Sequence, residues 1–350
     1  MIHTKNIKIS LQMLGLIAEI DEFKGAWAGF TSLRSEQLSV LKKISTIESI
    51  GSSNRIEGNK LSDAEVEKLL SRVDRKSFKS RDEEEVAGYA NLMDTVFDNY
   101  SVIPLSENYI KQLHKILLQF TGKDKRHSGE YKNISNSIVA YDRNGKEIGV
   151  ILETATPFDT PRLMEEIIEW TRKNLNDIFL HPLIVIGIFI VHFLAIHPFH
   201  DGNGRLSRAL TTMLLLKKGY DYVPYSSIEA IVETNKEGYY RALRRTQKDI
   251  WGNKVNYEPW LSFFLTTLQK QKKHLENKIN TVKKDDVKLT RNQIAILDLF
   301  DTESALGTSE IAAKLDMNIE TVKKNLKSMA ENGYIINHGK TKGAWYQLKR

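Results

Sequence analysis

The stretch His197-Pro-Phe-His-Asp-Gly-Asn-Gly-Arg205 decides the fold around it, because it separates two helical patterns. Pro198 lacks a backbone N–H and restricts the residue before it, so an apolar helix is expected to end at His197. Gly202 and Gly204 give the backbone freedom and leave no Cβ in the way of a ligand. The sequence therefore predicts a tight turn between two helices that a ligand can approach.

The helix after this turn is expected from Arg205 to about Lys217. Backbone N–H groups in its first turn, at Leu206 and Ser207, can hold an anion with the help of the helix dipole. Arg205 and Arg208 stand three positions apart, so their charges lie close together on the helix. The pattern predicts a phosphate site at the start of this helix.

Two further side chains supply chemistry beside the predicted phosphate site. Asp201 is a hard oxygen ligand suited to Mg²⁺, and His197 can accept a proton at neutral pH. The competing interpretation is a zinc site built from His192, His197, His200 and Asp201. Its spacing lacks the usual helical HxxxH pattern. We expect His192 to be a core histidine, and His200 has no predicted role.

The apolar run Leu183–Ile196 is expected to form a buried core helix, because it is shorter than the ~20 residues that span a bilayer. The chain of 350 residues contains no Cys, which excludes disulfides and thiol catalysis. Its first residues, MIHTKNIKIS, lack the apolar core of a signal peptide. These features predict a cytoplasmic protein. The net charge of +7 permits contact with nucleic acid without demonstrating it.

Apolar spacing with glycine and proline boundaries predicts a mainly α fold. Helices are expected at residues 35–57, 63–71, 83–99, 106–121, 161–174, 235–248 and 259–278. A β-hairpin is expected from Ser137–Tyr141 and Glu147–Glu153, because Asn-Gly inside Asp142–Gly145 is a strong turn signal.

The same spacing and boundaries divide the chain into four parts. An N-terminal helical region covers residues 1–105, and a core covers 106–268. A lysine-rich helix end and linker is expected at 269–287. Residues 288–350 are predicted to form three helices and two strands around a basic tip. This arrangement resembles a winged helix-turn-helix domain.

The segment His197–Arg208 resembles the signature of the Fic family, HPFx(D/E)GNGRxxR, and matches it at every specified position. The resemblance covers roughly residues 10–265. It implies a helical bundle with a β-hairpin flap. It also implies that AMP is transferred from ATP, with Mg²⁺, to Ser, Thr or Tyr hydroxyls of a protein target, including the protein itself.

The resemblance implies a role for most residues of the segment. His197 would deprotonate the target hydroxyl, Asp201 would hold Mg²⁺ on the phosphates, and Phe199 would be a packing anchor. The phosphates would be bound by Gly202, Asn203, Gly204, Arg205 and Arg208. Positioning and electrostatic stabilisation should dominate such phosphoryl-type chemistry.

The predicted hairpin, near residues 137–153, would be the flap. Strand addition along Ile138, Val139 and Ala140 would hold the target segment through its main chain. This mode of recognition needs little target sequence, so the sequence does not identify the target.

Ser53-Asn-Arg-Ile-Glu57-Gly58 resembles the (S/T)xxxE(G/N) inhibitory motif of the same family. Glu57 would end a helix and form an ion pair with Arg208, a strongly directional contact when buried. Arg208 could then not hold the γ-phosphate. The alternative is a surface glutamate near a helix end. Removal of AMP by the same site is a further activity found in some relatives.

Tyr239 and Tyr240 resemble the family's segment flanking adenine, and Tyr240 could stack on the base. Simple helix packing is the alternative for Tyr240. Gln247 stands where some relatives have Asn, which leaves that adenine contact open. Core positions are expected for Trp260, Phe263 and Phe264.

The C-terminal part leaves two interpretations open. In one, Lys323, Lys324 and Lys327 enter the major groove of duplex DNA while Lys340 and Lys342 contact phosphates. In the other, the domain docks a protein or supports a homodimer. The leading prediction is an autoinhibited protein adenylyltransferase, and the alternative is a nucleotide-sensing, DNA-binding transcriptional regulator.

Overall fold

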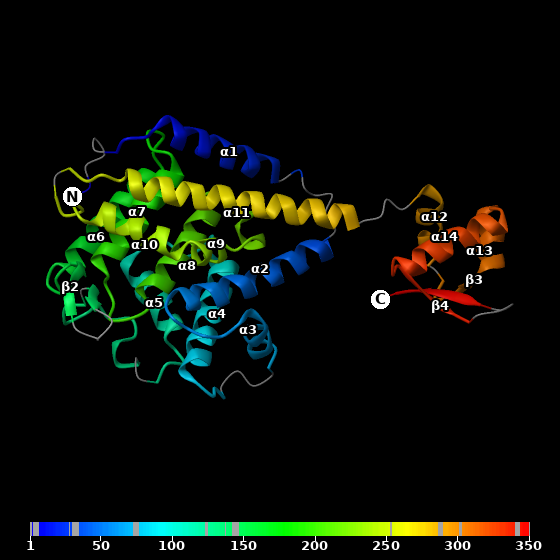
Figure 1. Ribbon diagram of the computed structural model, residues 1–350, viewed down its shortest axis with the longest axis horizontal. Coiled ribbons are helices and arrows are strands. Elements are labelled where there is room, and N and C mark those ends of the chain that lie inside the picture. Colours follow the sequence, from blue (N-terminus) through cyan, green and yellow to red (C-terminus); the bar gives the residue numbers. More distant parts are fainter. Residues whose placement is uncertain are drawn as a thin grey trace. The chain divides into compact units, whose positions relative to one another are not determined.

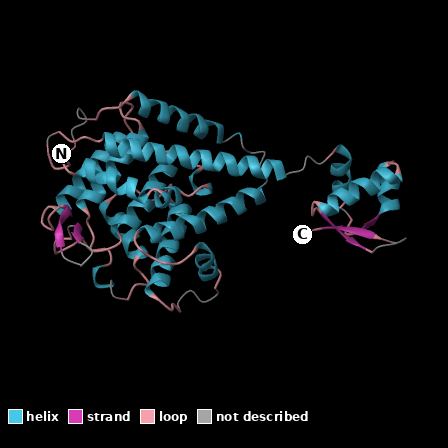
Figure 2. Cartoon of the chain, viewed as in Figure 1, coloured by secondary structure: helices cyan, strands magenta, loops and turns pink. Residues whose placement is uncertain are grey.

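The computed structural model describes residues 2, 7–27, 29, 35–72, 77–122, 125–136, 138–141, 147–252, 254–285, 290–300, 303–339 and 344–349. The chain divides into two units, Met1–Glu276 and Asn277–Arg350. Helices make up most of the described residues, as the sequence predicts (Figure 2). No helix in the described part of the chain combines the length and apolarity that a membrane span needs.

The first unit is built from helices and one hairpin (Figure 1). Its elements are α1 (Leu11–Trp27), α2 (Ser35–Ile56), α3 (Asp63–Leu70), α4 (Arg81–Asn99), α5 (Glu107–Leu117), η3 (Lys125–His127), β1 (Ile138–Tyr141), β2 (Glu147–Leu152), α6 (Thr160–Leu175), α7 (Pro182–Ile196), α8 (Asn203–Lys217), η4 (Val223–Tyr225), α9 (Ile228–Thr234), α10 (Lys236–Gln247) and the start of α11 (Glu258–Asp285).

The core of this unit is α7, in which every residue from Leu183 to Ile196 is buried. It packs against α6, α8 and α10. Gly187 lets α11 approach closely, because a Cβ there would lie only 2.7 Å from Leu261 Cδ2. Trp260 Nε1 also donates to Gly187 O at 2.7 Å. The predicted core helix is therefore confirmed.

Helix α1 was not expected from the sequence. It lies along α11 in Figure 1, and Lys272 Nζ is 3.1 Å from Glu19 Oε1. Its buried side chains are Met13, Leu16, Ile17, Ile20 and Phe23. Leu11 and Leu14 are exposed on the same helix, so its apolar stripe is blurred in the sequence.

The hairpin forms where it was predicted. Strands β1 and β2 are antiparallel, with Ile138 opposite Leu152 and Tyr141 opposite Glu147. The register shifts twice along this short ladder. The predicted turn at 142–145 lies outside the described residues.

Several helix boundaries differ from the prediction, most of them by one or two residues. Helix α8 begins at Asn203 rather than Arg205, because Gly202 adopts a left-handed φ of 78° and starts the helix directly behind the turn. Helix α5 ends at Leu117, before the expected Thr121. Helix α11 runs to Asp285, past the expected Lys278.

The second unit contains α12 (Arg291–Leu299), β3 (Leu306–Gly307), α13 (Thr308–Leu315), α14 (Ile319–Glu331), β4 (Ile335–His338) and β5 (Trp345–Leu348). The three strands form an antiparallel sheet in the order β3-β5-β4. A separate apolar core includes Ile296, Ile311, Val322 and Leu326. Three helices and the β4–β5 pair were expected, and the short strand β3 was not.

Candidate active site

The predicted turn joins α7 to α8 through two left-handed residues. His197 ends α7 with φ of 52°, and its N–H donates to Phe193 O at 2.9 Å. A left-handed conformation is unfavourable for a residue with a Cβ and is frequently found at functional sites. Gly202 adopts φ of 78° at the start of α8, where glycine carries no such cost.

The His197 ring is set up to accept a proton. Its Nδ1 lies 3.3 Å from Leu194 O. A carbonyl oxygen can only accept, so the proton belongs on Nδ1 and Nε2 keeps its lone pair. Burial lowers the pKa of His197 to about 4. At neutral pH the imidazole is therefore uncharged and able to act as a base.

Asn203 holds the turn closed. Its Oδ1 accepts from Phe199 N at 3.0 Å, and its Nδ2 donates to Phe199 O at 2.7 Å. The side-chain amide thus bonds the loop backbone, and a side-chain contact of Asn203 with phosphate would have to share these groups. Leu206 N donates to Gly202 O at 2.8 Å, so the Leu206 N–H, expected to face an anion, is already used inside the helix. The N–H groups of Asn203, Gly204 and Arg205 precede this first helical bond and are the ones suited to an anion.

Phe199 is a buried packing residue, as the sequence analysis expects. It stacks on His114 with ring centroids 3.8 Å apart. The His114 Nδ1 accepts from Gly129 N at 2.8 Å, so its Nε2 donates to Asp201 O, 3.0 Å away. His114 therefore fixes the turn from α5, and no local sequence pattern pointed to it.

Asp201 is partly exposed and faces two arginines. Its Oδ2 lies 3.1 Å from Arg205 Nη2 and 3.4 Å from Arg81 Nη2, and its Oδ1 accepts from Gly202 N at 2.6 Å. Burial raises its pKa, but Arg205, the Gly202 N–H and Arg81 together lower it below the usual range.

A carboxylate of this kind fits Mg²⁺, which is commonly held by one or two carboxylates together with substrate phosphates and water. In the described part of the chain, no group of three or more Asp, Glu or His side chains could hold a metal by itself. A cation bound through Asp201 would thus need oxygen ligands from a substrate.

Arg205 is almost completely buried at the start of α8. Its Nη1 lies 3.6 Å from Glu85 Oε2. Its Nε has no hydrogen-bond partner among the described residues. The N-terminal end of α8 therefore carries a buried guanidinium charge next to the loop that joins α7 to α8.

Ser53 of α2 and Glu57, directly after this helix, hold Arg208 through three bonds. Arg208 Nε donates to Ser53 Oγ, and Nη2 donates to Ser53 O and to Glu57 Oε1, each at 2.8 Å. Burial opposes its charge, but attraction to Glu57, Tyr239 and Tyr89 raises its pKa above the ordinary value. Its Nη1 has no hydrogen-bond partner among the described residues.

The Glu57 carboxylate lies over the first turn of α8. A Cβ built on Gly204 would overlap Glu57 Oε1 and lie 3.3 Å from Arg208 Nη1. Only glycine permits this approach. The carboxylate thus lies beside Arg208 at the start of the helix.

The predicted base-binding residues divide into two kinds. Tyr239 is buried, with its ring 5.8 Å from that of Trp260 and 5.2 Å from that of Tyr240. Gln247 is also buried, and its Nε2 donates to Val191 O at 3.3 Å. Both pack in the core, whereas Tyr240 is only half-buried. Trp260 and Phe264 are buried and Phe263 is half-buried.

The remaining predicted residues lie elsewhere. Ile138, Val139 and Ala140 form β1. Lys323, Lys324 and Lys327 are exposed on α14, where Lys323 Nζ is 2.7 Å from Glu320 and Lys327 Nζ is 3.9 Å from Glu331. Lys340 and Lys342 lie outside the described residues. His192 is buried, and its Nε2 is 2.8 Å from Tyr257 Oη.

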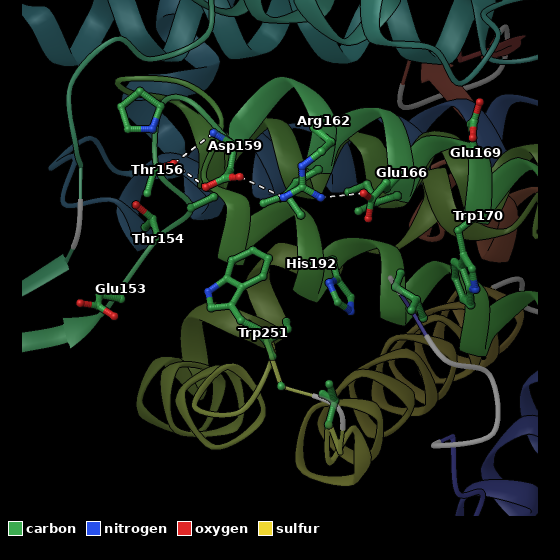
Figure 3. Close-up of a pocket in the computed structure, with 18 of the residues that line it drawn as sticks. Glu153, Thr154, Thr156, Asp159, Arg162, Glu166, Glu169, Trp170, His192 and Trp251 are labelled. Carbon is green, nitrogen blue, oxygen red and sulfur yellow. Dashed lines mark hydrogen bonds and ion pairs between the residues drawn. The ribbon is translucent and has the colours of Figure 1, made fainter.

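A separate cavity of about 810 Å³ borders α7 at His192. It is lined by α6, residues 153–157, the segment 250–257 and His192. Figure 3 shows Arg162 on α6 bonded to Asp159 and Glu166, above Trp251 and His192. None of the described lining residues belongs to His197–Arg208.

Comparisons with known proteins give a family match over part of the chain. The model of the Fic/DOC family matches residues 104–215. The match contains the hairpin and the turn, and it leaves out α2 with Glu57 and α10 with Tyr240.

Curated relatives are named adenylyltransferases. A probable protein adenylyltransferase from Aquifex aeolicus is 31% identical over 102 residues, which are 29% of this chain and 31% of that protein. Protein adenylyltransferase Fic from Drosophila willistoni is 26% identical over 256 residues, which are 73% of this chain and 46% of that protein. The chain spans from under a third to about half of the length of these relatives.

Solved structures share the fold. A Fic family protein from Desulfovibrio desulfuricans has a TM-score of 0.65 at 21% identity, over 98% of this chain and 97% of its own. A Fic domain containing signaling protein from Bacteroides thetaiotaomicron has a TM-score of 0.60 at 22% identity, over 75% of this chain and 97% of its own. At these identities the likeness concerns the fold alone.

Proposed function

This chain carries a Fic domain, and on that premise we propose that it is an autoinhibited protein adenylyltransferase. It transfers AMP from ATP to a Ser, Thr or Tyr hydroxyl of a protein target, including its own. The names of the curated relatives support the activity. The observation that carries the proposal is the neutral His197, with Nε2 free to accept a proton, beside a helix start rich in guanidinium groups.

The reaction follows from this arrangement. His197 Nε2 takes the proton of the target hydroxyl as its oxygen attacks the α-phosphorus of ATP. The new P–O bond forms while the bond to the β-phosphate oxygen breaks, and pyrophosphate leaves. Arg205, Arg208 and the N–H groups of the first turn of α8 stabilise the phosphate charge. Asp201 would hold Mg²⁺, which would supply positive charge against the phosphates.

The hairpin supplies the target-binding element of the proposal. Strand β1 offers backbone groups to an extended target segment at Ile138, Val139 and Ala140. The half-buried Tyr240 stacks on adenine. Glu57 inhibits the reaction, because its ion pair with Arg208 removes a phosphate ligand.

Transfer of label from α-³²P-ATP to the protein tests the function. We expect the full chain to label itself, and His197→Ala to abolish the label while leaving thermal unfolding nearly unchanged. Label that persists in the His197→Ala protein would contradict the assigned base. An unlabelled Glu57→Gly protein that still folds would remove the proposed activity.

A second candidate function concerns the C-terminal unit. The exposed face of α14 carries Lys323, Lys324 and Lys327. Such a face can neutralise DNA phosphates. DNA binding through α14 is compatible with AMP transfer, since the two activities would use different units.

A further inference from the structure

Lys132 is a buried lysine beneath the catalytic turn. Only 3% of its surface is exposed. Its Nζ donates to Ile196 O at 2.8 Å, to Asn136 Oδ1 at 2.8 Å and to Thr154 Oγ1 at 3.0 Å. An ammonium group has three donors, so all of them are used inside the protein. Burying a charge this deeply is costly without such bonds.

The segment around Lys132 bonds every carbonyl group of the turn from Ile196 to Phe199. The backbone N–H of Lys132 donates to Pro198 O at 2.8 Å. Asn136 Nδ2 donates to His197 O at 3.1 Å and to Phe199 O at 2.7 Å. Carbonyl groups at the end of a helix have no partner within it. The cluster of Lys132, Asn136 and Thr154 therefore completes the end of α7 and supports the left-handed His197.

The same cluster joins the two ends of the hairpin. Asn136 stands just before β1, and Thr154 follows β2 closely. Thr154 Oγ1 donates to Asn136 Oδ1 at 2.8 Å, so two of the three acceptors of the ammonium group are also bonded to each other. The Lys132 ammonium group thus connects the backbone next to His197 with the residues that flank β1 and β2.

We propose that Lys132 is a positioning residue for AMP transfer, because it sets His197 relative to the strand that presents the target hydroxyl. This inference rests on the proposed function. A neutral side chain of similar length cannot replace it, since no neutral side chain offers three donors on one atom.

The charge of Lys132 also affects the pKa of His197, in addition to the hydrogen bonds that support the backbone. Burial lowers the pKa of Lys132 to about 8. Burial is also the main reason that the pKa of His197 is low, and the Lys132 charge lowers it further, while Glu57 and Asp201 raise it. We therefore expect the pKa of His197 to rise when the Lys132 charge is removed.

The test compares Lys132→Met with its parent, both in the full chain carrying Glu57→Gly. We expect kcat for label transfer to fall by about 10²-fold, as small misplacements of reacting groups do. The KM for ATP should stay close to that of the parent, because Lys132 touches none of the proposed phosphate ligands. The acid limb of the rate should move to higher pH, and the parent's decline near pH 8 should disappear.

Lys272→Met is the matched control. Lys272 is also a buried lysine, bonded to Glu19 and Glu276 at 3.1 Å, and lies on α11. It should lower stability without changing kcat or the pH profile. Equal losses of kcat in both lysine variants would mean general destabilisation and would overturn the proposal, as would an unchanged kcat and pH profile in Lys132→Met.

Two further measurements apply if Lys132→Met does not fold or if the parent transfers no AMP. If Lys132→Met does not fold, Thr154→Val removes one acceptor with little change in volume. It should lower kcat, and Thr154→Ser should restore it. Titration of the His197 ring signals by NMR needs no activity. A pKa of His197 that rises without Lys132 supports the geometry even if the parent transfers no AMP, whereas an inactive parent counts against the proposed function alone.

Discussion

Arg208 Nη2 donates to Glu57 Oε1 at 2.8 Å, and the same carboxylate lies over the first turn of α8 at Gly204. The two residues are 151 positions apart in sequence. Glutamate and a nucleotide phosphate present similar anionic oxygens to a guanidinium group. Under the proposed function, Glu57 and a nucleotide phosphate would compete for Arg208.

Glu57→Gly should raise self-labelling by about 10- to 100-fold. A hydrogen bond to a charged group contributes about 1.5–3 kcal/mol, and each ~1.4 kcal/mol is tenfold in rate. The measurement is the initial rate of label transfer from α-³²P-ATP. Glu57→Gln keeps the size of the side chain without its charge, so its labelling rate should lie between those of wild type and Glu57→Gly. No gain in a folded Glu57→Gly protein rules out inhibition by this residue.

Glu233→Gln should raise self-labelling by a smaller factor, because it loosens α2. Arg55 Nε lies 2.7 Å from Glu233 Oε1, and Arg55 Nη1 lies 2.8 Å from Asp63 Oδ1. These bonds hold the end of α2 against α9 and α3, two residues before Glu57. Lys43→Met is the control, since its surface pair with Glu67 joins α2 to α3 without touching this end. Equal activities in both variants would contradict the role of Arg55.

His192→Gln should make the protein less sensitive to acid. Burial lowers the pKa of His192 to about 3, whereas the ordinary value is 6.5. Between these values the unfolded chain binds the proton and the folded protein does not, so stability is lost as pH falls from 6.5 toward 3. The loss is at most about 1.4 kcal/mol per pH unit.

The glutamine of this variant would still accept a hydrogen bond from Tyr257, whose hydroxyl lies 2.8 Å from His192 Nε2 in the native protein. Urea unfolding midpoints at pH 7, 6 and 5 measure the effect. Wild type should lose more stability over this range than the variant. Parallel losses would show that His192 does not take up a proton on unfolding.

Binding of duplex DNA should weaken steeply with salt if α14 contacts phosphates. Replacing Lys323, Lys324 and Lys327 by alanine should flatten the slope of log K against log salt by about 0.9 for each lost contact. Lys314→Ala is the control, because Lys314 is an exposed, carboxylate-paired lysine of the same unit that lies on α13 and not on α14. Absence of binding at low salt would favour a protein-docking or dimer-supporting role instead.

The sequence predicts the parts of this molecule that rest on local patterns. Uninterrupted apolar residues mark α7, Pro198 marks its end, and Asn-Gly marks the hairpin. The start of α8 was placed two residues late, because the left-handed Gly202 allows the helix to begin immediately. Exposed leucines hid α1, since periodicity is visible only where one face is polar.

The supporting contacts of the site could not be predicted in this way. Lys132 bonds a carbonyl 64 positions away, and His114 bonds one 87 positions away. Neither distance follows a helical or strand period. The encounter of Glu57 with Arg208 was expected only through the family resemblance, because no property of either residue alone selects the other.

Arg208 is charged and buried, so activation has to leave it with a negatively charged partner. A buried cation without a counter-ion is strongly destabilising. If Glu57 departs and nothing replaces it, two of the three bonds described above, those to Ser53, remain to Arg208. The switch from the inhibited to the competent state is then an exchange of counter-ions. A deregulated protein should melt at a lower temperature than its parent and recover when a polyphosphate is supplied.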